Sequence, residues 1–237
     1  MNMNGKTAVV AGGTGRVGEG IVKMLLSRGA QVFVPVRSEE KRKRPEGYVG
    51  ADAASRLVCV PADVGEEASV EQFRKTVTDR VAHLDLAVAS LGGWYYGYSL
   101  HHMPTDDWHA VIEGNLTTHF LFMRAFLSLF HDQNEGMYVM INGGAADVPA
   151  PDSGVISVVA AAQKMMGCVL AEEAHGTNVR VYTVEAFNPV RTRRRGSEDS
   201  DDWVSAEQLG EYILRLYSGA VAAKGDVVHT IYSTADV

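Results

Sequence analysis

The stretch Val9-Val10-Ala11-Gly12-Gly13-Thr14-Gly15-Arg16-Val17-Gly18 decides the fold of this chain. Its apolar start predicts a buried strand, its glycines predict a tight turn, and residues 19–28 predict a helix. Such a turn needs glycine, because side chains would clash there and would keep a ligand's phosphates away from the backbone. The N-terminus of the following helix is an anion site, since its first N–H groups are free and its dipole is positive. A strand before the turn and a helix after it favour a ligand-binding loop over a purely structural turn.

Strand and helix patterns alternate along the rest of the chain. The further predicted strands span residues 31–36, 57–61, 85–90, 137–142, 179–184 and 226–232. The further predicted helices span residues 66–82, 105–130, 154–175 and 205–218. This alternation implies right-handed βαβ crossovers and a parallel sheet with helices on both faces. We predict a doubly wound α/β fold of about seven strands, in a single domain over residues 1–237.

Composition and charge exclude several classes of protein. The formal net charge of -7 argues against binding nucleic acid through a basic surface. The two cysteines, Cys59 and Cys168, provide neither a disulfide framework nor a zinc pattern. The histidines His101, His102 and His109 lack the spacing of metal ligands, so we predict no metal.

No targeting or membrane segment is apparent in the sequence. Residues 1–6 lead into the first strand without the basic segment and apolar segment of a secretory signal. The apolar stretch at residues 116–130 is interrupted by His119 and Arg124 and is too short to span a bilayer. We therefore expect a cytoplasmic protein that acts on a small-molecule substrate, without nucleic acid or membrane as a partner.

Several short motifs follow the glycine turn in a distinctive order. They are Pro61-Ala62-Asp63-Val64, Ala89-Ser90-Leu91-Gly92, Asn115, Lys164 and Phe187-Asn188-Pro189-Val190-Arg191-Thr192. Over almost the whole length, this order resembles the short-chain dehydrogenase/reductase family, which has a Rossmann-like fold. The resemblance implies that Asp63 contacts an adenine, that Asn115 and Lys164 belong to the active site, and that the last motif closes over a nicotinamide.

The resemblance and the glycine loop together imply a set of cofactor-binding residues. They are Gly12, Thr14, Gly15, Arg16, Val17, Gly18, Arg37, Ser38, Asp63, Val64, Ser90, Leu91, Gly92, Lys164, Pro189, Val190 and Thr192. A site for the unphosphorylated dinucleotide usually has an acid about 20 residues beyond the glycines. Here Arg37 ends the second strand instead, and Arg16 offers a second guanidinium for a phosphate. We predict NADP(H) rather than NAD(H), the alternative being that Arg37 is only solvated.

The catalytic part of the resemblance is weaker than the cofactor part. In the family a Tyr hydroxyl exchanges the proton, and a Lys four residues later lowers the pKa of that Tyr and holds the ribose. Counting back from Lys164 gives Ala160, which has no proton to transfer. The substrate-orienting Ser of the family would lie at the end of the fifth strand, where Gly144 stands. Of the usual catalytic residues, the sequence retains only Asn115 and Lys164.

Other groups could replace the missing tyrosine. Tyr95, Tyr96 and Tyr98 follow the fourth strand, where they could donate a proton or simply line an apolar pocket. Ser157 lies two helical turns before Lys164 on the same face, but an alcohol is a poorer acid than a phenol. Asp147, just past the fifth strand, is a further candidate. The sequence does not choose among these proton donors.

Two further features concern a lid and a subunit interface. Arg191, Arg193, Arg194 and Arg195 lie where the family has its substrate lid, and they could bind an anionic substrate or pair within the loop. The predicted helices at residues 105–130 and 154–175 carry apolar residues on more than one face, including Phe120, Phe122, Phe126 and Phe130. Such an apolar surplus indicates a partner, and we expect a homodimer or homotetramer.

Two functions remain open from the sequence. The first is an NADP(H)-dependent oxidoreductase that acts on a carbonyl or an activated double bond with an unusual proton donor. The second is a catalytically degenerate protein that binds NADP(H) as a sensor, scaffold or partner subunit. The glycine loop, Arg37 and Lys164 support both, whereas Ala160 and Gly144 favour the second.

Overall fold

A computed structural model describes residues 1–38, 51–193, 200–221 and 226–237, without the side chains of residues 51 and 52. In this part of the chain, seven strands form one sheet in the order β3-β2-β1-β4-β5-β6-β7. All neighbouring strands are parallel. The predicted doubly wound α/β fold of seven strands is therefore confirmed.

The elements follow the predicted alternation. The strands are β1 Thr7–Ala11, β2 Gln31–Val36, β3 Leu57–Pro61, β4 Leu86–Ala89, β5 Gly136–Gly143, β6 Val179–Ala186 and β7 Val228–Ile231. The α-helices are α1 Gly18–Ser27, α3 Ala51–Ala54, α4 Glu67–Thr78, α5 Thr105–Ile112, α6 Thr118–Gln133, α7 Gly154–Glu173 and α8 Ala206–Tyr217. Short 3-10 helices are η1 Leu100–His102, η3 Gly144–Ala146 and η4 Thr234–Asp236. The largest boundary error concerns α4, which was predicted to reach Ala82 and ends at Thr78.

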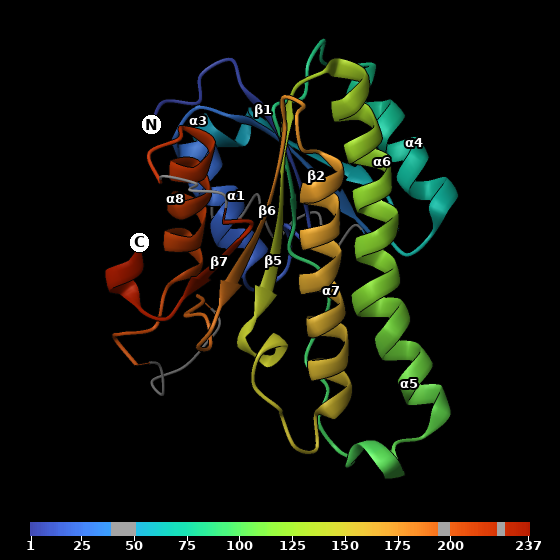
Figure 1. The fold of residues 1–237 in the computed structure, drawn as a ribbon. Helices are drawn as coiled ribbons and strands as arrows, with labels where there is room; N and C mark the ends of the chain where they lie inside the picture. The colour runs from blue at the N-terminus through green and yellow to red at the C-terminus, as the bar shows by residue number, and fades with distance from the viewer. Residues whose placement is uncertain (39–50, 194–199, 222–225) are drawn as a thin grey trace.

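Two helical layers cover the sheet. Figure 1 shows α1 and α8 on one face and α4, α6 and α7 on the other. Successive residues of β1 point to opposite faces of the sheet. Val10 packs in the core with α1 and α8, whereas Val9 and Ala11 pack in the core with α4 and α6. This double burial explains why the first strand is a continuous apolar run in the sequence.

The strand order places a ligand-binding crevice next to β1. This strand pairs with β2 on one side and with β4 on the other, so the direction of winding reverses between β1 and β4. Ligands of open α/β sheets bind at this reversal, outside the carboxyl ends of the strands. The segments after β1, β4, β5 and β6 are brought together at that edge.

A π-helical turn interrupts the helix predicted over residues 105–130. The turn, η2 Glu113–Thr117, separates α5 from α6 and has Asn115 at its centre. The Asn115 side chain donates a 3.0 Å hydrogen bond to the carbonyl of Val111, so the turn is held in part by its own residue. Turns of this kind occur frequently at functional sites.

One helix of the described residues, α7, is long and apolar enough to cross a membrane by length and composition. The sequence interpretation had named residues 116–130 as the longest apolar stretch instead. In the fold, α7 packs against β5 and β6, and Val155, Val159 and Ala160 are buried. This packing is that of a core helix in an α/β domain.

The apolar surplus of α6 is mostly core. Phe122, Phe126 and Phe130 are fully buried, and Phe120 alone of the four is exposed. On α7, by contrast, Val158, Met165 and Val169 are exposed at spacings of seven and four residues, which places them on one face. These three residues form the exposed α7 stripe.

His119 is fully buried in α6, where its Nε2 lies 3.4 Å from the carbonyl oxygen of Leu91. Burial lowers the pKa of His119 to about 4, so the ring is neutral in the folded protein at neutral pH. The unfolded chain takes up this proton near pH 6.5. The resulting stability is complete above about pH 6.5 and is lost as the pH falls towards 4.

This coupling predicts a specific pH dependence. Between pH 8 and pH 5, the free energy of unfolding of the wild-type protein should fall by about 2 kcal/mol more than that of the His119→Asn variant. Urea denaturation at both pH values measures the difference. His131→Asn, at an exposed histidine of the same helix, is the matched control and should behave as wild type. Equal pH dependence in wild type and His119→Asn would show that His119 is not buried in its neutral form.

Candidate functional site

A large pocket lies at the carboxyl edge of the sheet. Its volume is about 1060 Å³, and its walls come from the β1–α1 loop, the segments after β4, β5 and β6, and one face of α7. We call it the carboxyl-edge pocket. Its polar side chains, among the described residues, are Arg16, Ser90, Trp94, Asn115, Asn142, Gln163 and Asn188.

The glycine loop forms one wall of this pocket and has no room for side chains. A Cβ on Gly12 would lie 1.9 Å from the carbonyl oxygen of Ser90, and one on Gly18 would lie 2.2 Å from the carbonyl oxygen of Gly12. Gly12 also has a φ of +75°, which disfavours any other residue. The loop therefore lies close against the segment after β4 and exposes backbone to the pocket.

The N-terminus of α1 faces the pocket without a cap. Val17 occupies the capping position and has no side chain that could accept a hydrogen bond there. Within the described residues, the backbone N–H groups of Arg16 and Val17 donate to no protein acceptor, and both residues line the pocket. The Arg16 side chain is exposed. These donors and the helix dipole suit a phosphate group.

The other predicted adenine-side residues lie outside the pocket wall. Arg37 and Ser38 are exposed directly after β2. Asp63 accepts a 2.9 Å hydrogen bond from the N–H of Gly65, so its carboxylate closes its own turn, and Val64 packs against the core. Neither Thr14 nor any of these four residues lines the pocket.

Asn115 connects the segment after β4 to α7. Its Oδ1 accepts a 2.9 Å hydrogen bond from the N–H of Gly93, and its backbone oxygen accepts a 2.8 Å bond from Nε2 of Gln163. Ser90, Leu91 and Gly92, which the sequence predicts as cofactor contacts, line the pocket beside it. Gln163 is buried, and its Oε1 accepts no hydrogen bond from the described residues, which leaves an acceptor on the pocket wall.

Lys164 does not line the pocket. Its Nζ donates to both carboxylate oxygens of Asp147, at 2.8 and 2.7 Å, and to Oε2 of Glu185 at 3.2 Å. Burial lowers the pKa of Lys164, but the hydrogen bonds to Asp147 and Glu185 outweigh it, so the pKa is raised and the ammonium stays charged. The prediction that Lys164 binds the cofactor finds no support in this arrangement, because the ammonium is bound by two carboxylates.

Glu185 explains why Lys164 is held. Its side chain is fully buried, and burial raises its pKa even though Lys164 and Thr230 stabilise the charged form. Asn142, Glu185 and Thr230 are register partners on three neighbouring strands, so their side chains form one row beneath α7. Sequence reasoning missed this row, although a glutamate within the apolar strand Val179–Ala186 is the signal that could have revealed it.

The pocket-facing side of α7 carries no acid. Ile156, Val159, Ala160 and Gln163 line the pocket, which gives two pairs spaced by four residues, Ile156 with Ala160 and Val159 with Gln163. Gly143 and Gly144 line it from β5 and η3, at the place where the resemblance puts a serine.

The predicted proton donors point elsewhere. The Tyr95 hydroxyl donates a 2.8 Å hydrogen bond to Asp107, and loss of solvent together with this bond raises the pKa of Tyr95 to about 12. Tyr96 and Tyr98 are exposed, and neither lines the pocket. Ser157 accepts a 3.0 Å bond from the N–H of Ala150, away from the pocket. Of the aromatic residues in this loop, Trp94 alone is a wall residue.

The segment after β6 closes the pocket on the other side. Pro189 and Val190 line it, whereas Thr192 does not, and its buried hydroxyl oxygen has no hydrogen-bond partner among the described residues. Arg191 donates to the carbonyl of Trp203 at 2.6 Å, and Arg193 lies 3.4 Å from Glu19 of α1. These two arginines therefore hold the segment in place. Arg194 and Arg195 lie outside the described residues.

A family model for short chain dehydrogenases matches residues 6–202. The chain belongs to the short-chain dehydrogenase family. It is 29% identical over 185 residues to an uncharacterized oxidoreductase, YvaG, of Bacillus subtilis, a match that covers 78% of this chain and 68% of that protein. It is 27% identical over 192 residues to the 3-oxoacyl-(acyl-carrier-protein) reductase FabG of Vibrio cholerae, covering 78% and 73% of the two chains.

Solved structures agree with the fold. A short-chain type dehydrogenase/reductase from Mycobacterium ulcerans superimposes with a TM-score of 0.85 at 20% identity, over 98% of this chain and 90% of that one. A 3-ketoacyl-(acyl-carrier-protein) reductase from Brucella melitensis, complexed with NADH, gives a TM-score of 0.84 at 18% identity over 100% of both chains. This dehydrogenase is thus an oxidoreductase by family, with the family's nucleotide-binding fold.

The positions of the family's Tyr and Lys need a correction in this dehydrogenase. Ala160 and Lys164 have the expected spacing, but Lys164 lies off the pocket wall. Ile156 and Ala160 are also four residues apart, lie one helical turn earlier, and both line the pocket. Periodicity along α7 does not distinguish the two registers, because both satisfy the interval of four residues.

A lysine substitution distinguishes a structural role from a cofactor-binding role. Lys164→Met should lower the free energy of unfolding by about 3 kcal/mol, because it leaves the buried Glu185 without its cation. The dissociation constant for NADPH should stay within about twofold of wild type, since weakening by less than 0.5 kcal/mol is expected without a direct contact. Urea denaturation and NADPH fluorescence titration measure the two quantities.

The matched control for this variant removes both charges. Lys164→Met/Glu185→Gln keeps an amide for Thr230 and should recover most of the lost stability. A large rise in the NADPH dissociation constant with little change in stability would place Lys164 at the cofactor and contradict the structural role.

Proposed function

We propose that this dehydrogenase is an NADP(H)-dependent oxidoreductase that reduces an activated double bond without an acid side chain in its pocket. The observation that carries the proposal is the pocket wall itself. Among the described residues that line it, none carries a carboxyl, imidazole, phenol, thiol or ammonium group. The dinucleotide-binding loop, in contrast, is complete.

The residues that would hold the cofactor fit its chemistry. The uncapped α1 N-terminus with Arg16 suits the pyrophosphate, and the glycine loop allows it to approach the backbone. The Gln163 amide oxygen, which accepts no hydrogen bond from the described residues and lies on the pocket wall, suits the nicotinamide end. When bound, NADPH supplies a hydride, which is two electrons with one proton.

The preference for the 2′-phosphorylated cofactor rests on the end of β2. Arg37 is exposed there and makes no hydrogen bond or ion pair with the described residues, so its guanidinium is available. The two positions directly after the strand, Arg37 and Ser38, carry no acid for a ribose 2′-hydroxyl. Planar guanidinium groups bind phosphate monoesters in two-point contacts.

Arg37→Ala tests this preference. The dissociation constant for NADPH should rise about 10- to 100-fold, which corresponds to the loss of a charge-assisted hydrogen bond. The constant for NADH should change by less than about twofold, because that cofactor has no 2′-phosphate to lose. Arg80→Ala, at an exposed arginine after α4, is the matched control for the loss of one positive charge. Equal weakening of both cofactors would overturn the NADP(H) assignment.

The acid-free pocket restricts the substrate class. Reduction of a simple ketone develops a strongly basic alkoxide, which needs a proton donor in the transition state. When the hydride is added to the far carbon of a conjugated carbonyl compound, the charge spreads over an enolate, and water can protonate the other carbon afterwards. The indole N–H of Trp94 on the pocket wall can orient such a substrate without exchanging protons.

The substrate proposal predicts selective turnover. Wild-type protein should oxidise NADPH with 2-cyclohexenone and yield cyclohexanone, but should leave cyclohexanone itself unreduced. NADPH absorbance and product chromatography measure both. Ketone reduction to the alcohol by the wild-type protein would show that an acid reaches the pocket and would contradict the proposal.

An engineered variant serves as the positive control for ketone reduction. Ile156→Tyr/Ala160→Lys places a phenol and an ammonium on the pocket wall and should raise ketone reduction by about 100-fold. Ala160→Tyr alone should not, because its prospective partner Lys164 is bound to Asp147 and Glu185. Ketone reduction in Ala160→Tyr would show that Lys164 is free to act.

A second candidate is a cofactor-binding protein without turnover, and the acid-free wall favours it as well. It predicts that the wild-type protein binds NADPH tightly and oxidises it with neither substrate, whereas Ile156→Tyr/Ala160→Lys still gains ketone reduction. The same measurements therefore separate the two functions.

We further propose a homodimer or homotetramer formed through the exposed α7 stripe. Met165 is 62% exposed, an unusual position for a large apolar side chain, and a two-fold contact would cover the stripe with its own copy. Met165→Glu should convert the assembly to a smaller species in light scattering coupled to gel filtration. Lys75→Glu, at an exposed position of α4, is the control. An unchanged mass for Met165→Glu would place the interface elsewhere.

A further inference from the structure

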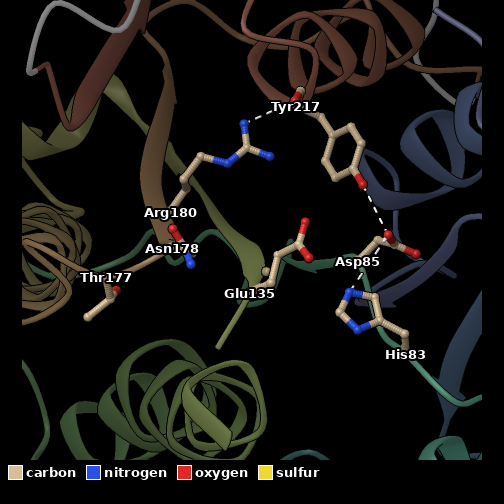
Figure 2. Close-up of a pocket in the computed structure, with 8 residues that line it drawn as sticks. His83, Asp85, Glu135, Thr177, Asn178, Arg180 and Tyr217 are labelled. Atoms are coloured by element: carbon tan, nitrogen blue, oxygen red, sulfur yellow. Dashed lines mark hydrogen bonds and ion pairs between the residues drawn. The ribbon is translucent and has the colours of Figure 1, made fainter. Parts of the chain in front are cut away.

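A second cavity lies at the opposite edge of the sheet, where the strands begin. Its volume is about 560 Å³, and Figure 2 shows it between the starts of β4, β5 and β6 and the end of α8. Apart from Gly136, every residue that lines it is polar or charged. We call it the amino-edge cavity; neither the proposed reaction nor its cofactor uses it.

The cationic wall of this cavity is held in a fixed position. Arg180 donates through Nη1 to the carbonyl oxygens of Leu216 and Tyr217, at 3.2 and 3.0 Å, and its guanidinium lies 5.3 Å from the centre of the Tyr217 ring. The Nε and Nη2 groups donate to no acceptor among the described residues. Figure 2 shows the guanidinium directed into the cavity next to the Tyr217 ring, and Asn178 also lines the cavity. The Asn178 amide has no partner within the described residues either.

The acidic wall is held in place as well. The backbone N–H of Glu135 donates to the carbonyl of Phe130, and the carbonyl of Glu135 accepts from the side-chain amide of Gln133. The same amide accepts from the N–H of Leu84 and donates to its carbonyl. The Glu135 carboxylate makes no hydrogen bond or ion pair with the described residues, and Figure 2 shows it directed into the cavity. Glu135 and Arg180 form no direct ion pair, and both line the cavity.

Asp85 does not compete for a ligand, because its carboxylate is already satisfied. It accepts hydrogen bonds from Lys6, from the N–H of Thr7 and from the hydroxyl of Tyr217, at 2.8, 2.8 and 3.1 Å. The bond to Tyr217 fixes the ring that stacks on Arg180. Asp85 therefore supports the cationic wall and leaves Glu135 as the free acid.

We infer that the amino-edge cavity binds a small zwitterion, an α-amino acid. The planar free edge of Arg180 and the Asn178 amide suit a carboxylate, which accepts two parallel hydrogen bonds from a guanidinium. Glu135 suits an ammonium group on the other side. The two free charges are opposite and balanced, so a ligand that carries only an anion leaves Glu135 unpaired and a ligand that carries only a cation leaves Arg180 unpaired.

The test uses the full-length protein and defined probes. Each of the proteinogenic L-α-amino acids is examined by ligand-detected NMR and thermal shift, beside propionate, which lacks the ammonium, and ethylamine, which lacks the carboxylate. At least one amino acid should bind, and both single-charge probes should bind at least 10-fold more weakly. No binding by any amino acid, or equal binding of propionate, would overturn the inference.

Variants assign the binding to this cavity. Glu135→Gln should weaken binding of the amino acid at least 10-fold and leave both the melting temperature and the NADPH dissociation constant unchanged, because the Glu135 carboxylate makes no hydrogen bond or ion pair with the described residues. Asn178→Ala should weaken it less, and Arg180→Lys keeps the charge while removing the planar contact. Glu66→Gln, at an exposed acid before α4, is the matched control and should bind as wild type. Wild-type binding by Glu135→Gln would place the amino acid elsewhere and refute the proposed site.

Discussion

The ion pair between Glu185 and Lys164 is the constraint on which the chemistry of this dehydrogenase depends. Glu185 is fully buried beneath α7, and an unpaired carboxylate there would cost several kcal/mol. Lys164 supplies the cation and is held further by Asp147. A lysine fixed in this way lies off the pocket wall, so one buried charge leaves the wall without an ammonium group.

The same row of polar groups holds α7 against the sheet next to the pocket. Asn142 donates a 2.9 Å hydrogen bond to the carbonyl of Ala160, and Gln163 donates to the carbonyl of Asn115 in the π turn. These amide contacts position the helix face that forms the pocket wall. They use groups that do not titrate near neutral pH, so the arrangement stays constant over a wide pH range.

The fold was predictable from the sequence because its signals are local. An apolar run followed by Gly12, Gly15 and Gly18 specifies the first strand, turn and helix, and alternation of the later segments specifies the parallel sheet. The π turn around Asn115 was not predictable, since one extra residue in a helix leaves the apolar period almost unchanged. The glycine loop itself was visible in the sequence for the same local reason.

The catalytic side depended on a choice of register that the sequence does not resolve. Ala160 with Lys164 and Ile156 with Ala160 have the same spacing, and only the packing of α7 shows which residues face the pocket. The partner of Lys164 is also distant in the chain, because Glu185 belongs to the next strand. A buried acid inside an apolar strand was the one available signal, and it predicts a cation nearby without naming which one.

A crystal structure of the protein with NADPH tests the central claim most directly. The account predicts that Nζ of Lys164 stays within hydrogen-bond distance of Glu185 and Asp147, and that no ammonium or phenol lies within 4 Å of the nicotinamide ribose or ring. Lys164 turned onto the ribose hydroxyls, with Glu185 left to another partner, would contradict it.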